Sequence, residues 1–242
     1  MNDKYLLALM YDFYNSNTLR GQNDDIGYYI KQIEKYSSKK VLIVGAGTGR
    51  VAIPLSEYCD ITALDFDLER LNVLKEKCKN IKTIYKNFLD FDTSENYDLI
   101  IVPYSTLQFD CDKNKLKEML LKLREIMTNK TISIFDMSES FNTKLEKESE
   151  FLFENYSKEI DDLVSVYYTS RKYDDHINFI IKYKLNKMKK ELIENEKYYF
   201  YSPVLLKNII DEVGLDIISL DSGYCNDDSF THKHLYHCTR IK

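Results

Sequence analysis

The chain of 242 residues has little of what several classes of protein need. No apolar run approaches the ~20 residues that span a bilayer, so no membrane partner is expected. The five cysteines are an odd number, widely spaced and without a C-x-x-C pair, which argues against a disulfide framework or a zinc motif. Basic residues are not in excess: the chain has 34 basic and 39 acidic residues, and its net charge is -5. Because binding to a phosphate backbone needs clustered positive charge, nucleic acid is not expected as a partner.

What is present suits a folded protein in a reducing compartment. The hydrophobic fraction of 44% and the aromatic fraction of 13% can build a packed core. The length fits one large domain or a core domain with one insertion, on a prior of roughly 100–200 residues per domain. The first residues include Asp3 and Asp12 and no small-residue cleavage site, unlike a signal peptide. The sequence therefore predicts a cytoplasmic protein.

Strand-like and helix-like stretches alternate along most of the chain. Val41–Val44 is a continuous apolar run that ends in glycine, which is typical of a central parallel strand. The alternation that follows predicts βαβ units and a mostly parallel sheet, an α/β fold, with Asp67 as the N-cap of one helix. The predicted strands are 41–44, 61–64, 82–85, 99–102, 132–136, 215–220 and 234–241, and the predicted helices are 4–14, 24–36, 50–58, 68–78, 113–128 and 203–213.

Residues 138–200 interrupt this alternation. A polar stretch at about 143–161 is predicted to be helical, and three stretches rich in Tyr, Ile and Val follow at 163–174, 177–185 and 191–202. We expect an antiparallel β insertion over the carboxyl edge of the main sheet, where open α/β sheets bind ligands. The predicted organisation is a core of residues 1–137 and 201–242 with an insertion of 138–200.

The sharpest motif is the glycine turn VLIVGAGTGR, with Gly45, Gly47 and Gly49 between a buried strand and a helix. Glycine allows a tight turn and the close approach of a ligand to the backbone, and a helix start offers unpaired N–H groups. A dinucleotide fold is an alternative, but its fingerprint has a glycine where this chain has Arg50. Asp65, at the end of the next strand, could accept hydrogen bonds from ribose hydroxyls of either nucleotide.

Several further segments extend the glycine motif into a family pattern. They are Asp25–Tyr29 (DIGYY), Tyr85–Phe91 (YKNFLDF), Val102–Phe109 (VPYSTLQF), Tyr201–Pro203, Gly214–Leu215 and Ser222–Tyr224. With the glycine turn, they resemble the class I S-adenosylmethionine-dependent methyltransferases, in a branch of bacterial enzymes that act on small molecules. The resemblance implies a Rossmann-like sheet, mostly parallel with an antiparallel last strand, and S-adenosyl-L-methionine as cofactor.

The resemblance also implies a set of cofactor-binding residues. Gly45, Ala46 and Gly47 would pass under the methionine and ribose, and Asp65 would bind the ribose hydroxyls. Phe66 and Phe88 would lie against the two adenine faces, with Asn87 accepting from the adenine amino group. The amino-terminal segment would fold over the cofactor, with Arg20 beside its carboxylate. The full implied set is Tyr11, Tyr14, Arg20, Gly45, Ala46, Gly47, Asp65, Phe66, Asn87, Phe88 and Pro103.

The acceptor side departs from the family pattern. Phe109 stands where the family has a histidine, so no catalytic residue is assigned. An amine can lose its proton to solvent before it binds, which favours nitrogen as the methyl acceptor. Tyr104, Ser105, Gln108 and the insertion are predicted to wall the acceptor site. The tyrosines of the insertion could form a cage for an amine, but tyrosine is also a favoured strand residue, and ordinary pairing across strands is the preferred interpretation. The glutamates after the turn Lys182–Lys190 are predicted to form a solvated face: Glu191, Glu194 and Glu196.

The predicted function is methyl transfer from S-adenosylmethionine to a small-molecule acceptor, preferably an amine, by a monomer or homodimer. Two alternatives stay open at this point. One is a methyltransferase that acts on RNA or protein, and the other is a non-catalytic sensor that binds the cofactor. No metal site is predicted, and His232, His234 and His237 are assigned to the surface of an edge strand.

Overall fold

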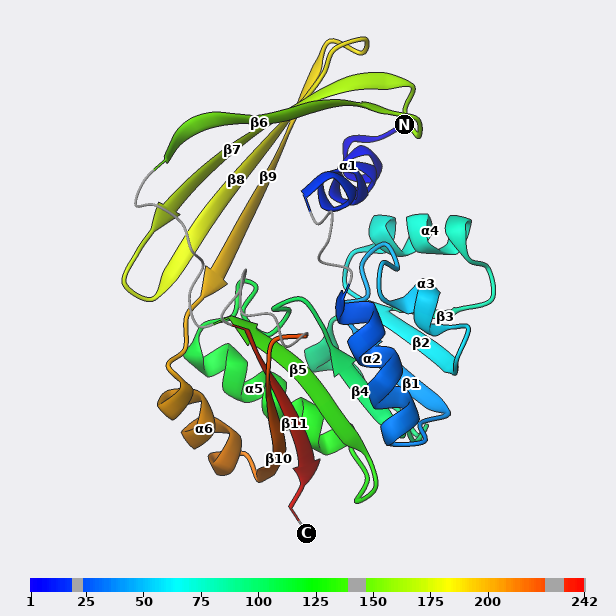
Figure 1. Cartoon of the computed structure of the whole chain (residues 1–242), viewed down its shortest axis with the longest axis vertical. Helices are drawn as coiled ribbons and strands as arrows, with labels where there is room; N and C mark the ends of the chain where they lie inside the picture. Colours follow the sequence, from blue (N-terminus) through cyan, green and yellow to red (C-terminus); the bar gives the residue numbers. More distant parts are fainter. Residues whose placement is uncertain (19–23, 139–146, 225–232, 242) are drawn as a thin grey trace.

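The computed structural model describes residues 1–18, 24–138, 147–224 and 233–241. Its main sheet has seven strands in the order β10-β11-β5-β4-β1-β2-β3 (Figure 1). Strands β5, β4, β1, β2 and β3 pair in parallel, and β10 runs in the same direction. Only β11 is reversed among these seven strands, antiparallel to its neighbours β5 and β10, as predicted. The strands are β1 (Lys40–Val44), β2 (Asp60–Asp65), β3 (Lys82–Tyr85), β4 (Leu99–Val102), β5 (Ile132–Ser138), β10 (Leu215–Ser222) and β11 (Lys233–Arg240).

Helices cover both faces of this sheet. Val41 and Ile43 of β1 pack in one apolar cluster with α2, α3 and α4, while Leu42 and Val44 pack in another with α5 and α6. This burial on both faces explains the continuous apolar sequence of the strand. The helices are α2 (Asp24–Lys35), α3 (Ala52–Leu55), α4 (Leu68–Lys77), α5 (Lys113–Ile126) and α6 (Pro203–Glu212), with a short 3-10 helix, η1 (Phe88–Asp90).

The helix starts follow local capping chemistry. Asp67 accepts from the backbone N–H groups of Glu69 and Arg70 and begins α4, as predicted. The helix expected at 50–58 is shorter, spanning only Ala52–Leu55. Pro54 lies inside this helix without an N–H to donate, and the Ser56 hydroxyl bonds to the Ile53 carbonyl. The Ser56 N–H also bonds to the Ala52 and Ile53 carbonyls, and the helix ends there after one turn.

The second sheet is antiparallel, in the order β6-β7-β8-β9. Its strands are β6 (Lys147–Ser157), β7 (Asp162–Lys172), β8 (His176–Leu185) and β9 (Lys190–Tyr199). The helix predicted at 143–161 is wrong over residues 147–157, which form β6, and residues 143–146 lie outside the described residues. The strand is at the edge of its sheet, with Phe153 half-buried against the core and Phe151 exposed, so its outward face tolerates the polar residues that suggested a helix.

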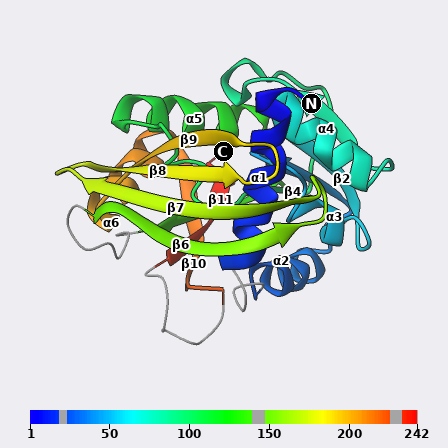
Figure 2. The same cartoon turned by 90° about the horizontal axis from the view of Figure 1, so that it is seen from above.

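The first helix, α1 (Asp3–Thr18), lies between the two sheets (Figures 1 and 2). Its Leu6, Met10 and Phe13 pack against β7 and β8 of the second sheet, in a cluster that includes Tyr183. Its other side contacts α4 of the main sheet. Although the sequence assigns α1 to the core region 1–137, its apolar face is buried by the insertion.

The second sheet is anchored at the carboxyl edge of the main sheet, as predicted. The Tyr199 N–H donates to the Gln108 carbonyl at 3.0 Å, and the Asp110 N–H donates to the Lys197 carbonyl at 2.7 Å. These bonds join the end of β9 to the loop after β4. Within the described ranges, no helix has the length and apolarity to cross a membrane.

The histidine assignment is wrong for His237. Strand β11 lies inside the sheet, and His237 is fully buried, with ring nitrogens 2.5 Å from the Tyr28 hydroxyl and 2.9 Å from the Tyr36 hydroxyl. His234 precedes it on the same strand, and His232 lies outside the described residues. No group of three His, Cys, Asp or Glu side chains that could hold a metal ion occurs in the part of the chain that the structure describes.

Candidate active site

The glycine turn leaves β1 in a conformation that other residues rarely adopt. Gly45 and Gly47 have φ values of 73° and 53°. A Cβ atom at Gly45 would lie 2.7 Å from Thr106, so the turn packs directly against the loop that follows β4. A Cβ atom at Gly47 would be 3.7 Å from the Tyr11 ring, in ordinary contact with α1. The turn is therefore flanked by the loop after β4 at Gly45 and by α1 at Gly47.

Asp65 holds this turn from the end of β2. Its Oδ2 accepts from the Gly47 N–H at 2.7 Å, and its Oδ1 accepts from the Asp67 N–H at 2.8 Å. Burial raises the pKa of this carboxyl, and the two backbone N–H groups oppose that shift. The carboxylate is thereby fixed beside the turn, and its further lone pairs can accept from a ligand.

The residues predicted around adenine differ in exposure. The Phe66 side chain is 60% exposed beside Asp65, whereas Phe88 is only 5% exposed and packs in the core. Asn87 is exposed and caps η1, its Oδ1 accepting from the Leu89 N–H at 3.0 Å. The two rings thus do not form a symmetrical open pair in this structure, and Phe66 is the accessible one.

The amino-terminal helix covers the turn through specific contacts. Asp12 accepts from the Thr48 hydroxyl and from the Lys77 ammonium group. Tyr11 lies over the turn, and Tyr14 packs against Phe153 of the second sheet with ring centroids 6.4 Å apart. Arg20 lies outside the described residues. Helix α1 therefore connects the glycine turn to the second sheet.

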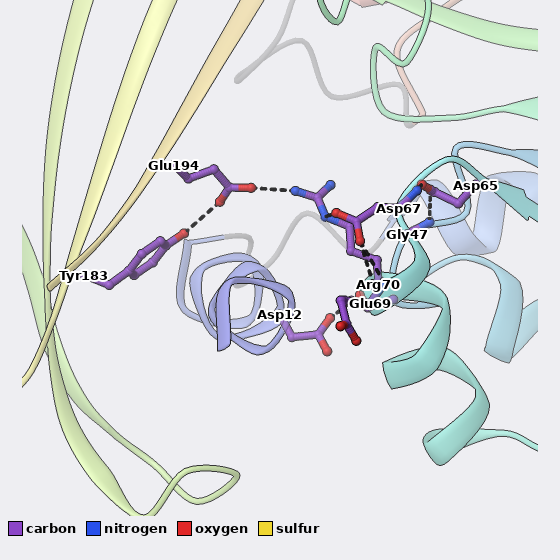
Figure 3. Close-up of polar contacts among 9 residues, drawn as sticks. Asp12, Gly47, Asp65, Asp67, Glu69, Arg70, Tyr183 and Glu194 are labelled. Atoms are coloured by element: carbon purple, nitrogen blue, oxygen red, sulfur yellow. Dashed lines mark hydrogen bonds and ion pairs between the residues drawn. The ribbon is translucent and has the colours of Figure 1, made fainter. Parts of the chain in front are cut away.

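Arg70 connects the same two regions, a role that no pattern in the sequence indicates. Its Nη2 donates to Glu194 Oε1 of β9 at 2.5 Å, and its Nε lies 3.7 Å from Asp67 Oδ2 (Figure 3). Its guanidinium carbon lies 4.2 Å from the Tyr11 ring centroid. An isolated arginine on a helix reads as a solvated charge, so only the assembled fold places it beside Asp65 and under the insertion.

The prediction of a solvated glutamate face is wrong for Glu194 and Glu196. Alternate residues of a strand share a face, and Glu194 and Glu196 share theirs with Tyr198 on the side of β9 that faces α1. The Glu194 side chain is only 12% exposed and accepts from the Tyr183 hydroxyl at 3.3 Å. Glu191 lies on the opposite face of the strand and is exposed, as predicted.

Burial and neighbouring charge give these two carboxyls unusual acidity. Burial raises the pKa of Glu194, and the Arg70 guanidinium opposes the shift. Burial and the Glu194 charge raise the pKa of Glu196 to about 7, again against Arg70. The site thus holds a carboxyl that changes its protonation state near neutral pH.

The loop after β4 contributes differently from prediction. Gln108 is fully buried, and its side chain bonds to the backbone of Ser138 and Tyr199, so it joins the two sheets instead of facing an acceptor. Ser105 is buried as well, while Tyr104 has a left-handed φ of 58° and donates to Asn15 Oδ1 at 3.4 Å. Pro103 is buried, and its carbonyl accepts from the Thr106 N–H at 3.3 Å.

Comparisons with known proteins agree with this architecture. Residues 41–130 match the family model described as a methyltransferase domain. A provisionally named methyltransferase of Geobacillus sp. (strain WCH70) is 20% identical over 117 residues, which are 46% of this chain and 47% of that protein. The match spans about half the length of this curated relative.

Two solved structures resemble nearly the whole chain. An S-adenosylmethionine-dependent methyltransferase from Clostridium acetobutylicum ATCC 824 has a TM-score of 0.80 at 16% identity, covering 96% of this chain and 98% of its own. The sugar N-methyltransferase KedS8 from Streptoalloteichus sp. ATCC 53650 has a TM-score of 0.77 at 12% identity, covering 96% and 93%. At these identities the likeness establishes the fold.

The seven-strand order and the glycine turn define a Rossmann-like fold, and residues 41–130 within it match the methyltransferase domain model. The fold is that of the class I S-adenosylmethionine-dependent methyltransferases, as the sequence resemblance predicted. S-adenosylmethionine is the predicted cofactor, and the similar Clostridium acetobutylicum structure is named as an S-adenosylmethionine-dependent methyltransferase.

Proposed function

We propose that the chain transfers a methyl group from S-adenosylmethionine to the nitrogen of a small-molecule amine. The observation that carries this proposal is the glycine turn held by Asp65 at the carboxyl edge of the sheet, with Gly47 donating to its carboxylate at 2.7 Å. A turn of bare backbone beside a fixed carboxylate suits a nucleoside with a diol.

The residues present fit such a cofactor. Gly47 offers backbone without a side chain opposite α1, Asp65 has acceptor capacity, and Phe66 presents an exposed ring next to it. Asn15 on α1 is 4% exposed, and its Nδ2 has no hydrogen-bond partner among the residues that the structure describes. When bound, S-adenosylmethionine supplies an electrophilic methyl group on a sulfonium.

We assign the chain's own residues the following roles. Gly45, Ala46 and Gly47 lie under the cofactor, and the Asp65 carboxylate accepts from its ribose hydroxyls. Phe66 lies against the adenine, whose other contacts come from η1 and its cap. The proposed set is completed by residues over and around the cofactor: Tyr11, Tyr14, Arg20, Asn87, Phe88 and Pro103.

Two observations support nitrogen as the acceptor atom. Phe109 gives no imidazole at the end of the loop after β4, and an amine is a nucleophile that needs no strong base. KedS8, of similar fold, is named as a sugar N-methyltransferase. A monomer or homodimer in the cytoplasm remains our prediction for the assembly and its location.

A methyl-transfer screen tests this function. The purified chain is incubated with S-adenosylmethionine and a panel of amines, sugars and phenols, and products are measured by mass spectrometry together with S-adenosylhomocysteine. We expect the wild type to produce methylated amines and the Asp65→Ala variant to produce none. Products formed only from hydroxyl compounds would refute the amine assignment, and cofactor binding without any product would favour the sensor.

A further inference from the structure

We propose that Glu196 is the catalytic base of this reaction: its carboxylate binds the ammonium group of the acceptor and takes a proton from the nitrogen. The inference rests on the proposed function and deepens it, because it specifies a cationic amine as the acceptor class. Glu196, in the insertion, would thus act as the base, since Phe109 stands where the resembled family has a histidine.

The position of Glu196 follows from its neighbours on β9. On one side, Glu194 is bound to Arg70, whose guanidinium stacks on the Tyr11 ring that lies over Gly47. On the other side, Tyr198 pairs with Phe109 through a backbone bridge, with ring centroids 5.6 Å apart. Glu196 therefore lies between the cofactor side of the site and the loop after β4 (Figure 3 shows the Glu194–Arg70 side).

Aromatic rings surround this carboxylate. In the antiparallel register Glu196 is opposite Phe179 of β8, whose ring centroid is 5.4 Å from that of Tyr168 and 5.8 Å from that of Tyr198. Aromatic faces attract ammonium ions, most strongly where water is excluded. A carboxylate among such rings suits a small cation better than it suits a neutral sugar or phenol.

The polar contacts leave Glu196 available. Arg70, the cation that lowers its pKa, is bound to Glu194 at 2.5 Å. The hydrogen bond that Glu196 accepts from the Tyr198 hydroxyl is long, at 3.4 Å. On the facing helix, the buried Asn15 has its Nδ2 without a partner among the described side chains and backbone, while its Oδ1 accepts from Tyr104. Asn15 thus leaves a buried donor for a bound molecule on the helix that faces Glu196.

The groups that face Glu196 come from every element packed around it. They are Tyr11 and Tyr14 of α1, Arg70 of α4, Tyr104 after β4, Tyr168 of β7, Tyr183 of β8, and Glu194 and Tyr198 of β9. The pKa values of these tyrosines are raised, so they stay neutral near pH 7. The Glu196 pKa of about 7 suits a base that is ionised above neutrality and returns its proton to solvent.

The proton step balances within the acceptor and the protein. One N–H bond of the ammonium breaks, its electron pair stays on nitrogen, and the proton forms an O–H bond on Glu196. That pair then forms the new C–N bond as the C–S bond of the donor breaks, with the C–S electrons remaining on sulfur. Glu196 loses its proton to solvent after the product leaves.

The test uses sinefungin, an analogue that carries an amino group on carbon where the donor carries its methyl on sulfur, and S-adenosylhomocysteine, which lacks this group. Both are titrated calorimetrically into the wild type, Glu196→Gln and Glu191→Gln at several values between about pH 6 and pH 9. Glu191 is the matched control, since it lies on the same strand with its side chain 53% exposed. Thermal unfolding verifies that each variant is folded.

We expect the wild type to bind sinefungin roughly tenfold more tightly than S-adenosylhomocysteine near pH 8, because an ionised carboxylate faces the ammonium. This preference should fall as pH decreases through about 7, where Glu196 takes up a proton. Glu196→Gln should lose the preference and its pH dependence with unchanged affinity for S-adenosylhomocysteine. Glu191→Gln should behave like the wild type.

Persistence of the preference in Glu196→Gln would overturn the role of Glu196 while leaving the proposed function intact. A wild-type preference that does not change with pH would overturn it too, and this measurement needs no variant. If the wild type bound neither compound, the proposed function would fail together with the inference. If Glu196→Gln bound sinefungin and S-adenosylhomocysteine more weakly by the same factor, Glu196 would have only a structural role, and its assignment as the base would be overturned.

Discussion

Asp65→Ala is expected to weaken the binding of S-adenosylhomocysteine by at least about a hundredfold, because hydrogen bonds to a charged acceptor contribute roughly 1.5–3 kcal/mol each and two ribose hydroxyls lose theirs. The same substitution frees the Gly47 N–H, which the carboxylate now holds at 2.7 Å, so the turn also loses its fixed geometry. Calorimetric titration of the variant and the wild type measures the effect.

Asp60→Ala is the matched control for this prediction. Asp60 is exposed at the opposite end of the same strand, where β2 begins, and it lies far from the glycine turn along the strand axis. Its replacement should leave the affinity within about twofold of the wild type. If Asp65→Ala retained wild-type affinity while folded, the ribose would not be bound by this carboxylate.

Arg70→Met is expected to lower the free energy of unfolding by roughly 2 kcal/mol near pH 8. The substitution leaves Glu194 without its cation at a position where the side chain is only 12% exposed, and an uncompensated buried charge is strongly destabilising. The partial exposure of Arg70, at 22%, keeps the expected loss below that of a fully buried pair. Urea unfolding of the two proteins gives the difference.

The destabilisation by Arg70→Met should depend on pH. Burial holds the pKa values of Glu194 and Glu196 above those of the unfolded chain, and removing the cation raises them further. A carboxyl with a raised pKa in the folded state destabilises that state as pH rises through this pKa. The loss should therefore grow between about pH 5 and pH 8, and the double variant with Glu194→Gln should recover most of it. A loss of equal size at both pH values would contradict this account of the pair.

The architecture of the main sheet could be predicted because its signals are local. A buried parallel strand shows a continuous apolar run, as in Val41–Val44, and a ligand-binding turn shows its glycines. Capping residues such as Asp67 mark helix starts within a few positions. These features depend on neighbours in sequence, and the structure agrees with them.

The acceptor side could not be predicted because its signals depend on packing between distant segments. Leu192 lies on the same face of β9 as Glu194, and Ile193 lies on the opposite face. Because both residues are apolar, the sequence of β9 does not indicate which of the two faces is buried. Helix α1 decides this by covering the second sheet, and it also buries the cation Arg70. The polar edge strand β6 resembled a helix for the same reason, because one of its faces is solvated.

The central claim is that the glycine turn and Asp65 bind the nucleoside of S-adenosylmethionine. Calorimetric titration of the wild type with S-adenosylhomocysteine and, separately, with the dinucleotide NAD tests it most directly, since the dinucleotide fold is the alternative for a glycine-rich turn after the first strand. We expect S-adenosylhomocysteine to bind with one site per chain and NAD to give no saturable heat. Saturable binding of NAD without binding of S-adenosylhomocysteine would contradict the account.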